Sequence, residues 1–191
     1  LANARGVLFS EESQKAAQFI QLANAADTPL VFLHNTTGYM VGAAYEQGGI
    51  IKHGSMMINA VTNSTVPHLT VIIGSSYGAG TYGMSGRAFG NRFTFLWPTA
   101  KIAVMGPEAA VNAVYYNKIA AIIDDAERAA YVDTLREEYE ADIDILRLAS
   151  DLVIDAVVEP EHLRDELIAR LAAATTKDRG FSERRHGVPP V

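Results

Sequence analysis

Short apolar runs alternate along the chain with segments in which apolar residues recur at helical spacing. The runs are short and mainly apolar, which is typical of parallel strands covered on both faces. They lie at 30–33, 69–73, 93–97, 102–105 and 154–158, and residues 1–9 resemble the end of a further strand. This alternation predicts an α/β domain with a mainly parallel sheet.

The helical segments begin and end at recognisable signals. Ser10 is expected to cap the first helix, with Glu11 and Glu12 in its first turn, and Thr28-Pro29 to stop it. Residues 54–63 form a second predicted helix, and later helices begin at Pro107 and Pro160. The predicted inner positions are Ala16, Phe19, Ile20 and Ala23; Met57, Ile58 and Val61; Val132, Leu135, Tyr139, Ile143 and Leu146; and Leu163, Leu167, Ile168 and Leu171.

Length and composition narrow the class of protein. The chain has 191 residues, of which 49% are apolar and 20% charged, as expected for one globular domain. We assign residues 1–174 to this domain and residues 175–191 to an extended, polar, proline-containing tail. Apolar runs fall far short of the roughly 20 residues of a membrane span, and no signal peptide opens the chain. We therefore expect a soluble, cytoplasmic protein.

The absence of cysteine excludes disulfides, thiolate nucleophiles and cysteine-bound zinc. His34, His53 and His68 lack metal-ligand spacing, so we expect no metal in this domain. The net charge is −6, divided into about +2 up to Ala120 (seven basic and five acidic residues) and −8 beyond it (nine and seventeen). The first part can tolerate an anionic ligand, whereas no basic stripe indicates nucleic-acid binding.

One segment, TVIIGSSYGAGTYGM at 70–84, fits three different active-site patterns. GSSYG at 74–78 fits the nucleophile elbow of serine hydrolases, with Ser76 as nucleophile. GAGTYG at 78–83 fits the glycine-rich turn of dinucleotide-binding folds. The whole segment also predicts a strand, a glycine turn and a helix start, which can direct backbone N–H groups at an oxyanion.

The surrounding sequence favours the third pattern. A dinucleotide site needs an acidic residue at the end of the next strand, and none stands there. A hydrolase triad needs a downstream histidine, and only His162, in a first helical turn, and His186, in the tail, are available. A second glycine-bearing turn at Gly38-Tyr39 leaves the predicted sheet one helix earlier. Two such turns can together form an oxyanion hole, although two ordinary turns of an α/β fold fit equally well.

Several motifs are spread over nearly the whole chain: GVLFS (6–10), NTTGYMVG (35–42), YEQGGI (45–50), YGAG (77–80), YGMSGRA (82–88), WPTAKIAVMG (97–106), and RHG (185–187) followed by Pro189. Together they resemble the carboxyltransferase (beta) subunit of biotin-dependent acyl-CoA carboxylases. NTTGYMVG and YGAG-YGM-GRA are similar to the methylcrotonyl-CoA and geranyl-CoA carboxylase branch. The residues after Gly106 are more similar to propionyl-type carboxylases or glutaconyl-type decarboxylases.

The resemblance implies a crotonase-like (ClpP/crotonase) fold, a twisted sheet surrounded by helices. Family members contain two such domains, and this chain resembles only the C-terminal, biotin-side one. The implied enzyme transfers a carboxyl group from carboxybiotin, held on a carrier protein, to the α-carbon of an acyl-CoA. Backbone N–H groups stabilise the charge on the ureido oxygen, and the freed biotin nitrogen takes the α-proton.

The resemblance also implies the site residues. The catalytic backbone groups fall at Ala79 and Gly80, with Gly38 and Tyr39 on the facing turn. The residues expected to line the biotin are Tyr77, Gly78, Thr81, Tyr82 and Met40. The acyl-specificity position of the propionyl branch, an aspartate there, falls at Tyr82.

The implied partners are a biotin carboxylase or biotin carrier subunit and the N-terminal carboxyltransferase domain of a neighbouring subunit. Family members are hexamers, so a homo-oligomer is expected, without nucleic acid or membrane. Three alternatives remain open at this point. The chain could belong to a biotin-dependent decarboxylase, it could be a serine hydrolase using Ser76, or it could be a non-catalytic assembly module.

Overall fold

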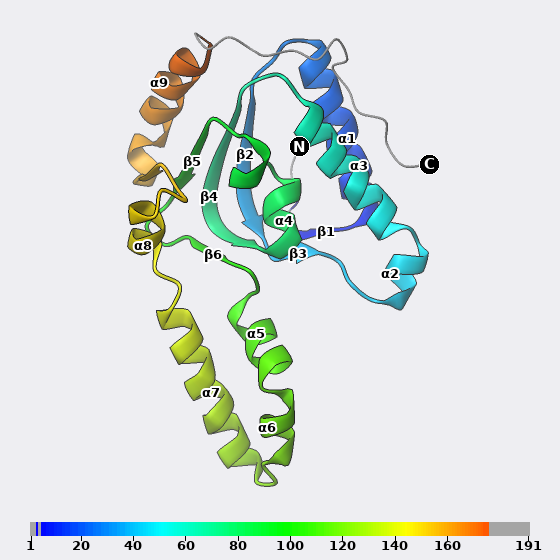
Figure 1. Ribbon diagram of the computed structural model, residues 1–191, viewed down its shortest axis with the longest axis vertical. Helices are drawn as coiled ribbons and strands as arrows, with labels where there is room; N and C mark the ends of the chain where they lie inside the picture. Colours follow the sequence, from blue (N-terminus) through cyan, green and yellow to red (C-terminus); the bar gives the residue numbers. More distant parts are fainter. Residues whose placement is uncertain (1–2, 4, 176–191) are drawn as a thin grey trace.

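A parallel sheet forms the centre of the computed structural model, which describes residue 3 and residues 5–175 (Figure 1). The strand order is β2 (Leu30–Thr36), β4 (His68–Tyr77), β5 (Phe93–Leu96) and β7 (Ala156–Val157). β6 (Lys101–Ala103) continues the sheet beside the carboxyl end of β4. These strands pair in parallel throughout, so the predicted α/β architecture is confirmed.

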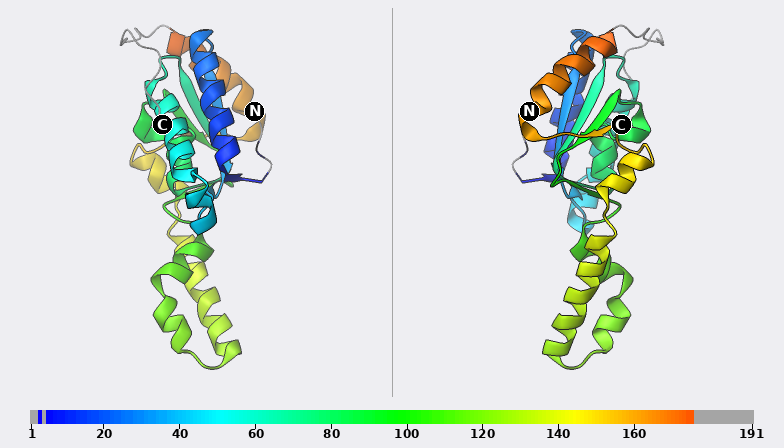
Figure 2. Two further views of the ribbon diagram at one scale, coloured as in Figure 1. Left: turned by 90° about the vertical axis from the view of Figure 1, so that its right-hand side faces the viewer. Right: turned by 90° about the vertical axis from the view of Figure 1, so that its left-hand side faces the viewer.

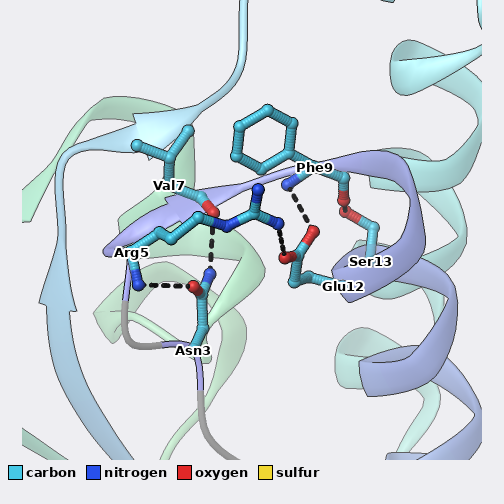
Figure 3. Close-up of polar contacts among 6 residues, drawn as sticks. All are labelled: Asn3, Arg5, Val7, Phe9, Glu12 and Ser13. Carbon is cyan, nitrogen blue, oxygen red and sulfur yellow. Dashed lines mark hydrogen bonds and ion pairs between the residues drawn. The ribbon is translucent and has the colours of Figure 1, made fainter.

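A second, two-stranded sheet lies beyond the carboxyl ends of β2 and β4. It pairs β1 (Val7–Leu8) with β3 (Gly38–Tyr39) in parallel. The corner between β1 and the first helix is held by side chains: Glu12 forms an ion pair with Arg5 and accepts the N–H of Phe9 at 3.2 Å (Figure 3). This small sheet fixes the turn that carries Gly38 and Tyr39.

Helices cover both sides of the central sheet. α1 (Ser10–Ala25) and α3 (Ile50–Asn63) pack together beside β2 (Figure 1). α8 (Ile145–Ser150) packs in the cluster of Ile72 and α9 (Leu163–Thr175) in the cluster of Val71, on opposite faces of β4. α4 (Gly78–Gly83) directly follows β4. The shorter elements are α2 (Ala43–Gln47), η1 (Arg87–Phe89) and η2 (Pro160–His162).

Three helices form an arm that projects away from the sheet. They are α5 (Pro107–Val114), α6 (Tyr116–Ala121) and α7 (Asp125–Ala141), and α5 packs against α7 (Figures 1 and 2). Pro107 stands in the first turn of α5, as predicted from its fixed φ. Within the described residues, no helix combines the length and the apolar character that crossing a bilayer would require.

The core is divided over the two faces of β4. On one side Leu30, Ile20 and Met57 join β2, α1 and α3 in one apolar cluster. The neighbouring β4 residues Val71 and Ile72 belong to two further clusters, with Phe95 and with Leu96 respectively. Because successive strand residues point to opposite faces, β4 is buried on both, as its apolar run predicted.

Two expectations for the first helix need correction. Ser10 is the first helical residue rather than the cap, and Phe9 takes the cap position. The buried face consists of Ser13, Ala17, Ile20, Ala23 and Asn24, whereas Phe19 is 44% exposed. The predicted stripe was rotated because two small polar residues, which apolar periodicity ignores, lie on the buried face.

Other predicted inner positions are also wrong. Ile143 and Leu146 lie beyond the end of α7, and Leu146 and Ile168 are exposed. β2 is an edge strand whose Val31 and Leu33 are exposed on its second face, although its apolar run predicted full burial. β2 also extends through residues 34–36, beyond the apolar run at 30–33.

The rotated face of α1 can be tested with two neighbouring substitutions. Ile20→Ala removes a buried side chain and should lower the free energy of unfolding by about 2–5 kcal/mol. Phe19→Ala removes a larger side chain from a half-exposed position and should cost less than half as much. Urea denaturation of both variants measures this, and a larger loss for Phe19→Ala would contradict the assigned face.

Candidate functional site

Two turns that leave the sheet in succession touch each other through their backbones. A Cβ atom added at Gly80, in α4, would lie 2.9 Å from the Cα of Gly38, in β3, and 3.3 Å from the Cγ2 of Thr36. Real Cβ atoms do not approach so closely, so a side chain at Gly80 would push the turns apart. The structure thus brings together the two turns that the sequence singled out.

The first turn presents the amides of Ala79 and Gly80. Both residues lie in the first turn of α4, where backbone N–H groups have no acceptor within the helix. Gly78 starts this helix with a φ of +57°, a left-handed conformation that favours glycine. Ala79 is exposed and Gly80 is buried against the facing turn.

The two predicted donors of the facing turn, the N–H groups of Gly38 and Tyr39, differ in their hydrogen bonding. The N–H of Gly38 donates to Thr36 Oγ1 at 3.2 Å, so it is already engaged. The N–H of Met40 donates to Leu8 C=O at 2.9 Å, and in a parallel pair alternate residues direct their amides to the partner strand. The amide of Tyr39 therefore points away from β1, while Gly38 contributes mainly by lacking a side chain.

The side chain of Tyr39 packs rather than reacts. Its ring lies between α3 and α4, only 3.2 Å from the place where a Cβ of Gly54 would stand, and its hydroxyl donates to Met57 Sδ at 3.7 Å. Burial raises the pKa of Tyr39 to about 12, so the phenol stays neutral. The ring therefore sets the spacing between the two helices.

The other predicted lining residues differ in accessibility. The ring of Tyr77 is buried and packs against Gly106, and the hydroxyl of Thr81 bonds Ser76 at 2.8 Å. These two side chains make contacts within the chain, and their place beside the biotin stays a prediction. Tyr82 is 46% exposed and meets Phe89 edge to face, and Met40 is half-buried.

The structure supplies a histidine partner for Ser76 that the sequence search missed. His34 Nδ1 lies 2.8 Å from Ser76 Oγ, and its Nε2 lies 2.6 Å from the Met84 carbonyl oxygen. Since a carbonyl only accepts, Nε2 carries the hydrogen and Nδ1 accepts the hydroxyl proton of Ser76. The two downstream candidates differ: His162 is exposed in η2, and His186 lies outside the described residues.

This serine and histidine do not form an accessible nucleophilic pair. Both side chains are fully buried, and each of their polar atoms already has a partner within the chain. A nucleophilic serine needs an exposed oxygen at the top of its turn. The geometry therefore does not favour the hydrolase interpretation of GSSYG.

A cavity of about 290 Å³ lies between the sheet and the segment formed by α4 and η1. Its lining includes His34, Thr70, Ile72, Thr81, Tyr82 and Arg87. Arg87 pairs with Asp155 at 3.3 Å, and Asp155 also accepts the N–H of Thr94 at 2.7 Å. Arg87 therefore links η1 to β5 and the segment before β7.

Comparison with known proteins points to one family. The model of the carboxyl transferase domain matches residues 1–189. A probable biotin-dependent acyl-coenzyme A carboxylase beta2 subunit of Mycobacterium tuberculosis is 57% identical over 91% of this chain and 34% of its own length. The 3-methylcrotonyl-coenzyme A carboxylase beta1 subunit of the same organism is 42% identical over 83% of this chain and 31% of its own length.

Solved structures agree. The transcarboxylase 12S hexamer, determined with hydrolysed methylmalonyl-coenzyme A, superposes with a TM-score of 0.84 at 33% identity over 97% of this chain and 35% of its own. The geranyl-CoA carboxylase beta subunit of P. aeruginosa gives a TM-score of 0.78 at 38% identity over 96% and 36%. These likenesses confirm the predicted crotonase-like fold. The chain spans about a third of the length of the relatives it matches.

The buried histidines make the stability sensitive to acid. Burial lowers the pKa of His34 to about 4, and burial together with the charge of Arg92 does the same for His68. The unfolded chain, with a histidine pKa near 6.5, binds these protons first, so stability falls as pH drops from about 6.5 toward 4. Each of the two histidines should lower the free energy of unfolding by about 2 kcal/mol between pH 7.5 and pH 5.

Urea denaturation between pH 7.5 and pH 5 measures this loss. His68→Gln should reduce the pH dependence by about half, whereas the exposed His162→Gln should leave it unchanged. An equal pH dependence in the wild type and in His68→Gln would contradict the assignment.

Proposed function

Because this chain belongs to the carboxyl transferase domain family, we propose that it is the carboxybiotin-side domain of an acyl-CoA carboxyltransferase. The observation that carries the proposal is the contact between Gly80 and Gly38, which holds two sets of backbone donors beside each other. The relatives support it, since they include biotin-dependent carboxylase subunits that match nearly all of the chain.

The residues at the two turns fit a neutral, planar ureido group. The contact surface is made of glycine backbone, so a flat ring can approach the amides without meeting a side chain. The exposed side chains of Tyr82 and of Val104, whose carbonyl lies beside Gly78, are uncharged and offer an apolar surface. Carboxybiotin on a carrier protein would supply the carboxyl group that is transferred.

Catalysis by this chain then rests on its amides. The N–H groups of Gly80 and Ala79 on α4, and of Tyr39 on β3, donate hydrogen bonds to the oxygen on which negative charge develops. One such donor is typically worth about 3–4 kcal/mol in the transition state. Because the donors are backbone groups of packed elements, they need no reorganisation as the charge appears.

The neighbouring side chains do not stabilise the developing charge, which is left to the backbone amides. Tyr39 holds its proton well above neutral pH, and both nitrogens of His34 are engaged in hydrogen bonds. Ser76 and Thr81 are bonded to each other. The side chains around the turns therefore shape and support the site rather than transfer protons.

The acyl-CoA and the partners follow from the same proposal. The remaining length of the relatives provides room for an N-terminal carboxyltransferase domain, which we propose binds the acyl-CoA opposite this domain. Residues 1–174 form the carboxybiotin-side domain, in an oligomer such as the hexamer of transcarboxylase 12S. Tyr82 faces the acyl group. Because the propionyl branch has an aspartate at this position, a tyrosine here favours an acyl chain other than propionyl.

A transfer assay tests the function. The chain is incubated with a carboxybiotin methyl ester and propionyl-, 3-methylcrotonyl- or geranyl-CoA, with and without an N-terminal carboxyltransferase domain. We expect acyl-CoA-dependent loss of the carboxyl group only when both domains are present. No turnover with any acyl-CoA in either arrangement would refute the proposal.

A single substitution tests the amide site. Gly80→Val should reduce carboxyl transfer at least 100-fold, because its Cβ forces the turns apart and misplaces the donors. Gly90→Ala is the control: its φ of +70° makes alanine cost about 1 kcal/mol, but no atom lies within 4 Å. Gly90→Ala should retain the wild-type rate of carboxyl transfer. If Gly80→Val also retained that rate, the assignment of Gly80 to the site would be wrong.

A further inference from the structure

One imidazole ties both ends of α4 to the sheet. His34, on β2, bonds Ser76 just before α4 through Nδ1 and the carbonyl of Met84 just after it through Nε2. Ser76 in turn bonds Thr81 inside the helix, at 2.8 Å. The resulting chain runs from the Thr81 hydroxyl through Ser76 and His34 to Met84, and His34 and Ser76 are fully buried.

A second buried histidine holds the segment that follows the carboxyl end of α4. His68 Nδ1 lies 2.9 Å from Ser85 Oγ, and Thr70 donates to the Ser85 carbonyl at 2.6 Å. Ser85 has a φ of +61°, which is unusual for a residue with a side chain, and it is fully buried. The segment that leaves α4 is therefore fixed from β4 as well as from β2.

These bonds matter because α4 has little stability of its own. It comprises six residues, three of them glycine, and no side chain caps its first turn. A helix of this length and composition is not stable alone, so its position depends on what holds it to its neighbours. Catalytic donors must stay within about 0.5 Å of their productive place.

We propose that His34, Ser76 and Thr81 are positioning residues that set the place of the Ala79 and Gly80 amides for carboxyl transfer. This inference rests on the proposed function. None of the three side chains needs to touch a ligand. Their hydrogen bonds link β2, the end of β4 and the helix, so the donors move only with the sheet.

Thr81 offers the sharpest test, because valine matches its shape and serine keeps its hydroxyl. In the assembled enzyme, Thr81→Val should lower kcat for carboxyl transfer about 10- to 100-fold. KM for the acyl-CoA should change less than about twofold, because the partner domain binds that substrate. Thr81→Ser should restore most of kcat.

A matched control removes a comparable hydrogen bond elsewhere. Thr134 Oγ1 donates to the Ala130 carbonyl at 3.0 Å in α7, away from α4, so Thr134→Val should leave kcat unchanged. A readout independent of activity is hydrogen–deuterium exchange of the peptide covering residues 77–84. Exchange there should accelerate in Thr81→Val and match the wild type in Thr81→Ser and Thr134→Val.

The outcomes separate this inference from the function on which it rests. A wild-type enzyme without transfer activity refutes the function. An active wild type together with a Thr81→Val variant that resembles Thr134→Val in kcat and in exchange refutes the positioning role. Loss of kcat with a normal KM, accelerated exchange and rescue by serine supports it.

Discussion

The contact between the backbones of Gly80 and Gly38 is the constraint on which the site depends. It joins the helix that follows the central strand β4 to the small sheet formed by β1 and β3. Because no side chain separates the two turns, the amides of Ala79, Gly80 and Tyr39 can face the same space. A crotonase-like fold supplies this geometry, since consecutive parallel strands end at the same edge of the sheet.

Buried hydrogen bonds between the sheet and the α4 segment stabilise this contact. Two neutral histidines, His34 and His68, cross from the sheet to the two ends of α4 and its following residue. Buried imidazoles with satisfied nitrogens are stable but sensitive to acid. The same residues that rigidify the turn thus account for the expected pH dependence of folding.

The glycine-rich segment 70–84 shows how structure separates patterns that share a sequence. Ser76 does meet a histidine, but the pair is enclosed and bridges elements of the fold. Thr81 and Tyr77, which the family resemblance places beside the ligand, also make contacts within the chain, Thr81 with Ser76 and Tyr77 with Gly106. The proposed donors are backbone amides of the turn, and a residue pattern cannot identify them because every residue except proline carries one.

The sequence by itself determined the α/β class, the central strands and the family, because short apolar runs, proline and glycine signals and specific motifs are local. It misplaced the inner face of α1 and the second face of β2, since burial there depends on small polar residues of α1 and on which strands the helices pack against. Only the tertiary structure decided that His34 partners Ser76 and that Gly80 touches Gly38. These pairs are 42 residues apart in each case, and contacts at such separation are set by how the strands align, not by local pattern.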